Sequence, residues 1–136
     1  MSDSLAVVGF GSMGSALVAG ALRSNLFSPT SIFVLDPDPL ARKRAGALGC
    51  VASDDPSIIA DASMIAFAVK PQSFPELALK IGALQPSTLV VSVMAGVSIA
   101  RLQEAFCDEL SCVRCMPNIA AQIGLAVTTY ACSPQC

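Results

Sequence analysis

Short apolar runs alternate with segments of helical composition along this chain. The runs expected to form strands are 5–8, 31–35, 50–52, 64–69, 88–93, 111–116 and 125–130. Their continuous apolar character is typical of parallel strands buried on both faces. The helices expected between them cover 15–22, 39–48, 54–60, 74–81 and 98–106. This alternation with short connections predicts right-handed crossovers and an α/β fold with a doubly wound, mainly parallel sheet.

The same pattern predicts one domain over residues 1–130 and a short tail over 131–136. At 136 residues the chain is long enough for one core but short for a two-domain enzyme. Its residues are 54% hydrophobic and 13% charged, against about 45–50% and about 25% in ordinary globular chains. A sheet buried on both faces explains part of this excess. The rest suggests apolar surface for a partner chain or a further domain.

A glycine-rich turn follows the first predicted strand and leads directly into a helix. Its residues are Gly9, Phe10, Gly11, Ser12, Met13 and Gly14. In a dinucleotide-binding turn, the first glycine permits the sharp turn, the second lets a pyrophosphate approach the backbone, and the third lets the helix pack against the strand. The pyrophosphate then lies on free N–H groups at the positive end of the helix dipole. Because glycines also serve ordinary turns, the motif alone leaves a plain strand-turn-helix unit as the alternative.

Asp36 strengthens the nucleotide interpretation. It ends the second predicted strand, about 20 residues beyond the turn, where a carboxylate accepts hydrogen bonds from the adenosine ribose. The two features together predict a Rossmann-like domain. An acid at this position favours NADH because it repels the 2′-phosphate of NADPH, whereas Arg42 or Lys43 offers a charge that could bind that phosphate. The sequence leaves the choice between NADPH and NADH open.

Three further loops follow the ends of predicted strands, at 70–72, 95–96 and 116–118. Open α/β sheets bind ligands beyond the carboxyl ends of their strands. Proline also simply ends strands, which is an adequate explanation for any one of these loops. Their combination favours a rigid backbone surface for a flat ring such as nicotinamide.

Charge and hydropathy argue against other partners. The net charge is −2, the only basic cluster is 42–44, and aromatic residues make up 5% of the chain, so nucleic-acid binding is not expected. No apolar run approaches the roughly 18 residues that span a bilayer, and the acidic start lacks the basic region of a secretory signal. We therefore expect a cytoplasmic protein without membrane contact.

The six cysteines and the absence of histidine limit metal chemistry. Without imidazole, histidine metal sites and histidine-based catalytic triads are excluded. Cys112, Cys115, Cys132 and Cys136 could be grouped as a zinc site, but residues three apart on a strand face opposite sides. A thioredoxin-type motif would belong at a helix N-terminus. We expect reduced cysteines and no metal.

In their order along the chain, four segments resemble the pyrroline-5-carboxylate reductases of proline biosynthesis. They are 9–16, 68–72, 92–98 and 116–118, and the resemblance covers nearly the whole chain. The resemblance implies hydride transfer from NADPH or NADH to the C=N carbon of 1-pyrroline-5-carboxylate, which yields proline. A protonated cyclic imine is already electrophilic, so positioning could supply much of the catalysis without a strong protein acid.

The resemblance also assigns cofactor contacts. Residues 10–13 hold the pyrophosphate, and the other cofactor residues, most of them beside the nicotinamide, are Ala68, Val69, Lys70, Pro71, Gln72, Ala95, Gly96, Pro117 and Asn118. No catalytic residue is identified by this reasoning. Lys70 is the only charged candidate near the hydride path, and we expect a structural or positioning role for it, with proton transfer as the alternative. Asn118 is a further positioning candidate.

The chain also departs from the family's pattern. Ile119 and Ala120 stand where the family usually has threonine and proline, and Asp54 or Asp55 replaces a common asparagine. Family members continue into a helical domain that forms an intertwined dimer and completes the substrate pocket, whereas this sequence stops at Cys136. We therefore expect the cofactor-binding part of a reductase that works with a partner domain or as a homo-oligomer. The alternatives are a non-catalytic NAD(P)-binding module, a degenerate fragment, or a domain of a related β-hydroxyacid-type dehydrogenase.

Overall fold

A computed structural model describes residues 3–117 and 128–136. Within them, seven strands form one sheet in the order β3-β2-β1-β4-β5-β6-β7. The strands are β1 Leu5–Val8, β2 Ile32–Leu35, β3 Val51–Ser53, β4 Met64–Phe67, β5 Leu89–Ser92, β6 Ser111–Met116 and β7 Thr129–Cys132. The strands from β1 to β6 pair in parallel, and β7 pairs antiparallel with β6. The predicted α/β, Rossmann-like, mainly parallel sheet is confirmed.

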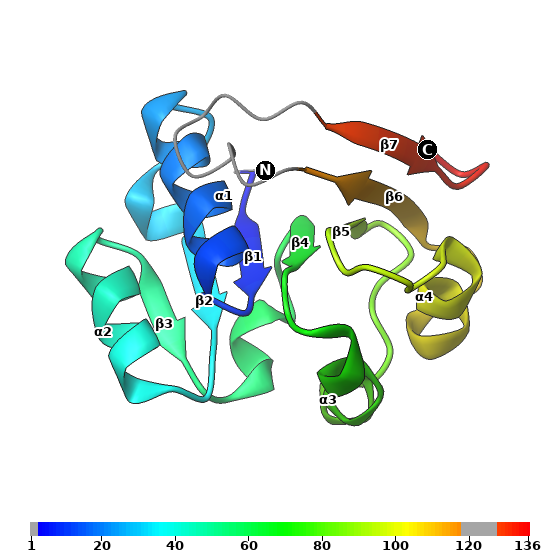
Figure 1. The fold of residues 1–136 in the computed structure, drawn as a ribbon, viewed down its shortest axis with the longest axis horizontal. Coiled ribbons are helices and arrows are strands. Elements are labelled where there is room, and N and C mark those ends of the chain that lie inside the picture. Colours follow the sequence, from blue (N-terminus) through cyan, green and yellow to red (C-terminus); the bar gives the residue numbers. More distant parts are fainter. Residues whose placement is uncertain (1–2, 118–127) are drawn as a thin grey trace.

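Helices cover both faces of this sheet (Figure 1). The α-helices are α1 Ser12–Arg23, α2 Pro39–Ala47, α3 Phe74–Ile81 and α4 Ile99–Phe106, and the 3₁₀ turns are η1 Pro29–Ser31, η2 Pro56–Ile59 and η3 Pro71–Ser73. In β1, Leu5 and Val7 pack with α1 and α2, whereas Ala6 and Val8 pack with α3 and α4. Successive strand residues point to opposite faces, so both sets need apolar side chains. This is why the central strands are continuous apolar runs.

An aromatic cluster joins β4 to the helices α3 and α4. The Phe67 and Phe106 rings are stacked with centroids 5.2 Å apart, and Phe74 meets them edge-on at 5.9 and 5.8 Å. All three side chains are buried. This packing fixes the first residue of α3 and the last residue of α4 against the end of β4, and hence where the loop after β4 lies.

The helix expected over 15–22 begins earlier, at Ser12, and two other predicted segments differ more from the structure. The helix expected over 54–60 is the 3₁₀ turn η2, which begins after Asp55, whose carboxylate accepts a hydrogen bond from the Ser57 N–H. The strand expected over 125–130 is found at Thr129–Cys132, and residues 125–127 lie outside the described part of the chain. The tail expected over 131–136 therefore begins inside the sheet.

Ser133 explains why this end of the chain is not a loose tail. Its N–H donates to the Cys112 carbonyl over 2.8 Å, and its Oγ accepts from the Cys112 N–H over 3.0 Å. Ser133 is buried. The four residues of β7 are exposed, so burial of apolar side chains does not hold this strand in place. The polar contact of Ser133 holds it against β6, at the edge drawn in red in Figure 1.

Candidate functional site

The order in which strands are added to the sheet reverses between β1 and β4, and the candidate site lies beyond the carboxyl ends of these parallel strands. Strand β2 follows β1 on one side of it, whereas β4 lies on the other. Ligands of open α/β sheets bind at such a switch point. The Gly9 N–H donates to the Leu35 carbonyl over 2.9 Å, and the Ala68 N–H donates to the Val8 carbonyl over 2.8 Å. The ends of three strands therefore meet at the glycine turn.

The fold requires two glycines of this turn. Gly9 has a φ of +92°, and a Cβ there would lie 2.8 Å from the Ala68 carbonyl oxygen. A Cβ on Gly14 would overlap the carbonyl oxygen of Gly9. Both positions bring backbone too close for any side chain, as predicted for the sharp turn and for the packing of the helix on the strand.

Gly11 is different, because nothing lies within 4 Å of the place where its Cβ would be. Gly11 is also the N-cap of α1, and no side chain caps this helix in the described residues. The first N–H groups of a helix have no partner within the helix, and Gly11 and Ser12 at this end of α1 are exposed. This bare backbone fits a pyrophosphate, which such groups bind.

Asp36 lies beside the turn and holds it in place. Its Oδ2 accepts a hydrogen bond from the Phe10 N–H over 2.7 Å, and its Oδ1 accepts from the Asp38 N–H over 2.8 Å. The sequence predicted this acid as a partner of the ribose. Its second role, anchoring the glycine turn, depends on a contact across 26 residues that no local pattern reveals.

Sequence reasoning missed Arg44. Its Nη2 donates to the Phe10 carbonyl over 3.2 Å. It also lines a hollow of about 500 Å³ beside α1, together with Phe10, Ser12, Ser15, Ala16, Ala19 and Leu48. The position of Arg44 could have been inferred from Ala41 and Ala45. These two buried residues are one helical turn apart and mark the side of α2 that faces the sheet. Residue 44 is adjacent to that buried side of the helix, so its side chain extends toward the turn.

The loops predicted to hold nicotinamide also lie at this edge of the sheet. Ala68 and Val69 are half-buried beside Gly9, whereas Lys70 and Gln72 are exposed where η3 begins at Pro71. Their contact with a cofactor stays a prediction.

The next two loops follow the neighbouring strands. The Val93 N–H donates to the Phe67 carbonyl over 3.1 Å, which holds the end of β5 against β4. Ala95 and Gly96 follow and are exposed, and Pro117 is half-buried after β6. Asn118 lies outside the described residues.

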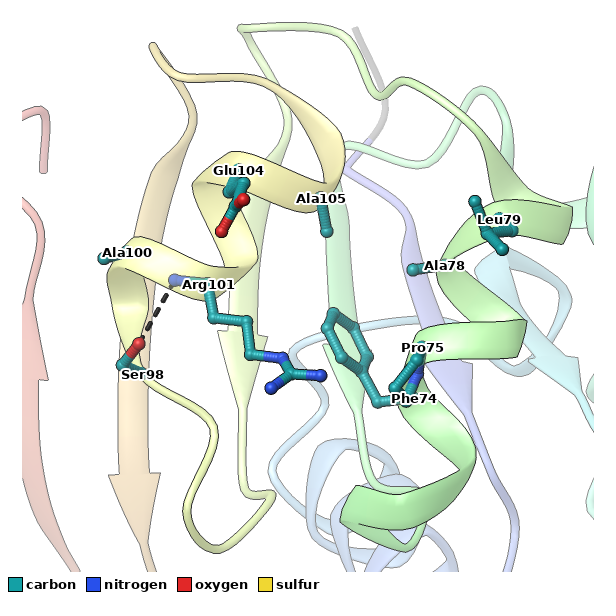
Figure 2. A pocket seen from close by; sticks show the side chains of 9 residues that line it. All are labelled: Phe74, Pro75, Ala78, Leu79, Ser98, Ala100, Arg101, Glu104 and Ala105. Carbon is teal, nitrogen blue, oxygen red and sulfur yellow. Dashed lines mark hydrogen bonds between the residues drawn. The ribbon is translucent and has the colours of Figure 1, made fainter.

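A second hollow, of about 570 Å³, lies between α3 and α4. Figure 2 shows Arg101 extending from α4 toward Phe74 of α3. The other residues around it are Pro75, Ala78, Leu79, Ser98, Ala100, Glu104 and Ala105. None of the predicted cofactor residues lines this hollow, so we place the candidate site at the strand ends.

Three of the cysteine thiols are poorly suited to metal binding. Burial, with a smaller contribution from Cys136, raises the pKa of Cys112 to about 11, and burial also raises the pKa of Cys50 and Cys115. A thiol must lose its proton to bind a metal well. In the described residues, no three His, Cys, Asp or Glu side chains gather in a way that could hold an ion. Nor does any helix there have the length and apolarity needed to cross a membrane.

Known proteins resemble this chain in sequence and in fold. Pyrroline-5-carboxylate reductase of Methanosarcina acetivorans is 29% identical over 133 residues, which are 96% of this chain and 49% of that protein. The chain thus spans about half the length of the curated relatives that it matches.

Solved structures show the same fold. A pyrroline-5-carboxylate reductase from Coxiella burnetii has a TM-score of 0.88 at 21% identity, over 100% of this chain and 52% of that one. Pyrroline carboxylate reductase of Plasmodium falciparum, with NADP bound, has a TM-score of 0.84 at 24% identity, over 98% of this chain and 49% of that one.

One protein family matches most of the chain. Residues 4–96 match the family described as NADP oxidoreductase coenzyme F420-dependent, and this stretch contains the glycine turn, Asp36 and the loops after β4 and β5. The cofactor class expected from the sequence, NADPH or NADH, is that of the family. The chain therefore belongs to this NADP oxidoreductase family, and its resemblance to the pyrroline-5-carboxylate reductases is confirmed over the amino-terminal half of those proteins.

Proposed function

We propose that this chain is the dinucleotide-binding part of a reductase that uses NADPH or NADH to reduce 1-pyrroline-5-carboxylate to proline. The observation that carries the proposal is the unfilled space over Gly11, at an uncapped helix N-terminus beside Asp36. The fold does not need a glycine there, whereas a pyrophosphate does. The relatives that match 94–97% of the chain supply the substrate class.

Different residues contact different parts of the cofactor. The backbone of 10–13 holds the pyrophosphate at the N-terminus of α1, and Asp36 accepts from the adenosine ribose. The loops at 68–72 and 95–96 orient the nicotinamide, and Pro117 completes that side. The resemblance assigns Asn118, which lies outside the described residues, to the same role. The dinucleotide supplies the hydride when it is bound.

Positioning is the main contribution of these residues to the reaction. Because the protonated imine is electrophilic by itself, holding the ring and the substrate in line could supply much of the rate enhancement. Lys70 is exposed at the start of η3, and we assign it a positioning role. Substrate binding is completed by a further domain or a second chain, as the resemblance implies. Exposed apolar side chains such as Leu79, Met116 and Tyr130 are consistent with such a partner.

Titration of the 136-residue chain with NADH and NADPH, followed by the fluorescence of the nicotinamide, tests the proposal. We expect saturable binding that ADP-ribose reverses, since ADP-ribose fills the same pyrophosphate site. Absence of binding by either dinucleotide would contradict the proposal.

An assay of 1-pyrroline-5-carboxylate reduction on the same sample then separates the finer alternatives. Turnover would show that these 136 residues reduce the substrate without a further domain or partner chain. Binding without turnover supports a cofactor-binding part that needs a partner, and adding the partner domain of a matched relative should then restore activity. If it does not, a non-catalytic module is the better description. Oxidation of a 3-hydroxy acid with NAD⁺ or NADP⁺ would indicate a β-hydroxyacid-type dehydrogenase instead.

A further inference from the structure

We propose that this chain selects NADH over NADPH and that Asp36 is the residue that discriminates between them. The inference rests on the proposed function, because it concerns the adenosine end of the same dinucleotide site. Its basis is the hydrogen bonding around Asp36 and around the three basic residues 42–44 that could offset its charge.

The Asp36 carboxylate is held in place at the end of β2. Hydrogen bonds of 2.7 and 2.8 Å from the N–H groups of Phe10 and Asp38 engage both of its oxygens. It cannot swing aside to admit a phosphate without releasing the glycine turn. A carboxylate has about four acceptor positions, so two remain for the 2′- and 3′-hydroxyls of the adenosine ribose. This acceptor-only group therefore suits the diol of NADH.

The 2′-phosphate of NADPH would bring a second negative group against the same carboxylate. The two groups that donate to Asp36 are neutral backbone N–H groups, which leave its formal charge in place. Like charges a few ångströms apart repel, and the repulsion grows where protein replaces water. Binding of NADPH therefore needs a cation directed at this point.

One guanidinium nitrogen of Arg42, Nη1, is already committed to other groups. Its Nη1 donates to the carbonyl oxygens of Asp36 and Pro37 over 3.0 and 2.8 Å, and it lies 3.9 Å from the Asp54 carboxylate. The side chain is only 25% exposed. Its guanidinium thus holds the backbone of the loop after β2 and already faces one carboxylate.

The other two basic residues face elsewhere. Ala41 is buried against the sheet, and at about 100° per residue Lys43 points roughly 200° away from it. Arg44 donates to the Phe10 carbonyl and lines the hollow beside α1 with Ser12 and Ser15. That hollow adjoins the helix N-terminus proposed for the pyrophosphate, which NADH and NADPH share. Arg44 therefore strengthens binding of either dinucleotide and leaves the discrimination to Asp36.

The dissociation constants of the wild-type chain for NADH and NADPH test the inference without any variant. We expect NADH to bind at least about tenfold more tightly, which corresponds to ~1.4 kcal/mol. Calorimetry with ADP-ribose and 2′-phospho-ADP-ribose should give the same preference, because these ligands lack the nicotinamide. Equal or tighter binding of the phosphorylated ligands would overturn the inference and leave the proposed function standing. If no dinucleotide binds, both fail.

A matched pair of variants identifies the residue. Asp36→Asn removes the charge at the ribose, and the ratio of the two dissociation constants should fall toward one. Asp61→Asn removes a charge from an exposed position before β4, at the opposite ends of the strands from the site, so its ratio should match that of the wild type. The ratio is the readout because Asp36→Asn also weakens the anchor of the turn and lowers both affinities. An unchanged ratio in Asp36→Asn, in a chain with native circular dichroism, would overturn the assignment to Asp36.

Discussion

The three glycines of the turn differ in what an added methyl group would meet. At Gly9 and Gly14 it would meet backbone, and at Gly11 it would meet nothing within 4 Å. The fold therefore requires glycine at positions 9 and 14, whereas only the proposed ligand binding requires it at position 11. A substitution at Gly11 tests binding with little effect on the fold.

Gly11→Ala should weaken dinucleotide binding by about tenfold or more, because the methyl group occupies the space that the pyrophosphate approaches. Its free energy of unfolding should change by no more than about 1 kcal/mol, since alanine is only a poorer N-cap. Gly20→Ala, in the middle of α1 with no atom within 4 Å of its added Cβ, is the control. It should stabilise the chain by about 0.5–1 kcal/mol and leave affinity unchanged. If Gly11→Ala binds the dinucleotide as tightly as the wild type, the pyrophosphate does not bind at this turn.

The residues of the site were predictable where a local pattern specifies them. Gly9, Gly14 and Asp36 lie at distances that the strand-turn-helix unit fixes, so their placement followed from spacing. The contacts of Asp36 with Phe10 and of Arg44 with Phe10 join segments 26 and 34 residues apart. The first contact depends on the pairing of β2 with β1, and the second depends on how α2 packs against the sheet; composition encodes neither.

Strand β7 shows how an element can be held by polar contacts. All four of its residues are exposed, so apolar burial contributes little to its position. The reciprocal hydrogen bonds between Ser133 and Cys112 join the chain just after β7 to the start of β6. The central strands were predictable because both of their faces are buried, whereas this edge strand offered no such pattern.

Ser133→Ala should lower the free energy of unfolding by about 1–3 kcal/mol, because it leaves the Cys112 N–H without its acceptor inside the protein. Urea unfolding followed by circular dichroism measures the change. Ser87→Ala, at an exposed position before β5, should stay within about 0.5 kcal/mol of the wild type. If the two variants unfold alike, the end of the chain contributes nothing to the stability of the sheet.

For the whole molecule, buried thiols link stability to pH. The pKa values of Cys50, Cys112 and Cys115 are all raised above 9.0, that of Cys112 to about 11. As the pH rises past 9, thiols of the unfolded chain lose protons before those of the folded chain do. The unfolded state then binds fewer protons, so stability falls as the pH increases.

The free energy of unfolding in urea, measured with a reductant, should therefore fall from pH 8 to pH 10. Other groups also titrate in this range, so the comparison with Cys112→Ala isolates one thiol. The variant is expected to be less stable at pH 8, because it loses buried volume, and to lose less stability between the two pH values. An identical loss in both proteins would show that Cys112 ionises as easily in the folded chain as in the unfolded one.

Gly9 and Phe10 are neighbours in the chain, and they connect the two ends of the candidate site. Gly9 packs against Ala68, at the start of the loop proposed to contact the nicotinamide, and the Phe10 N–H is fixed by Asp36, at the end proposed for the adenosine. In the proposed function, this dipeptide sets the distance between the sites for the two halves of a dinucleotide. Residues that are already ordered reduce the entropy that binding costs. We therefore expect the chain to bind molecules with a pyrophosphate bridge more tightly than separate mononucleotides.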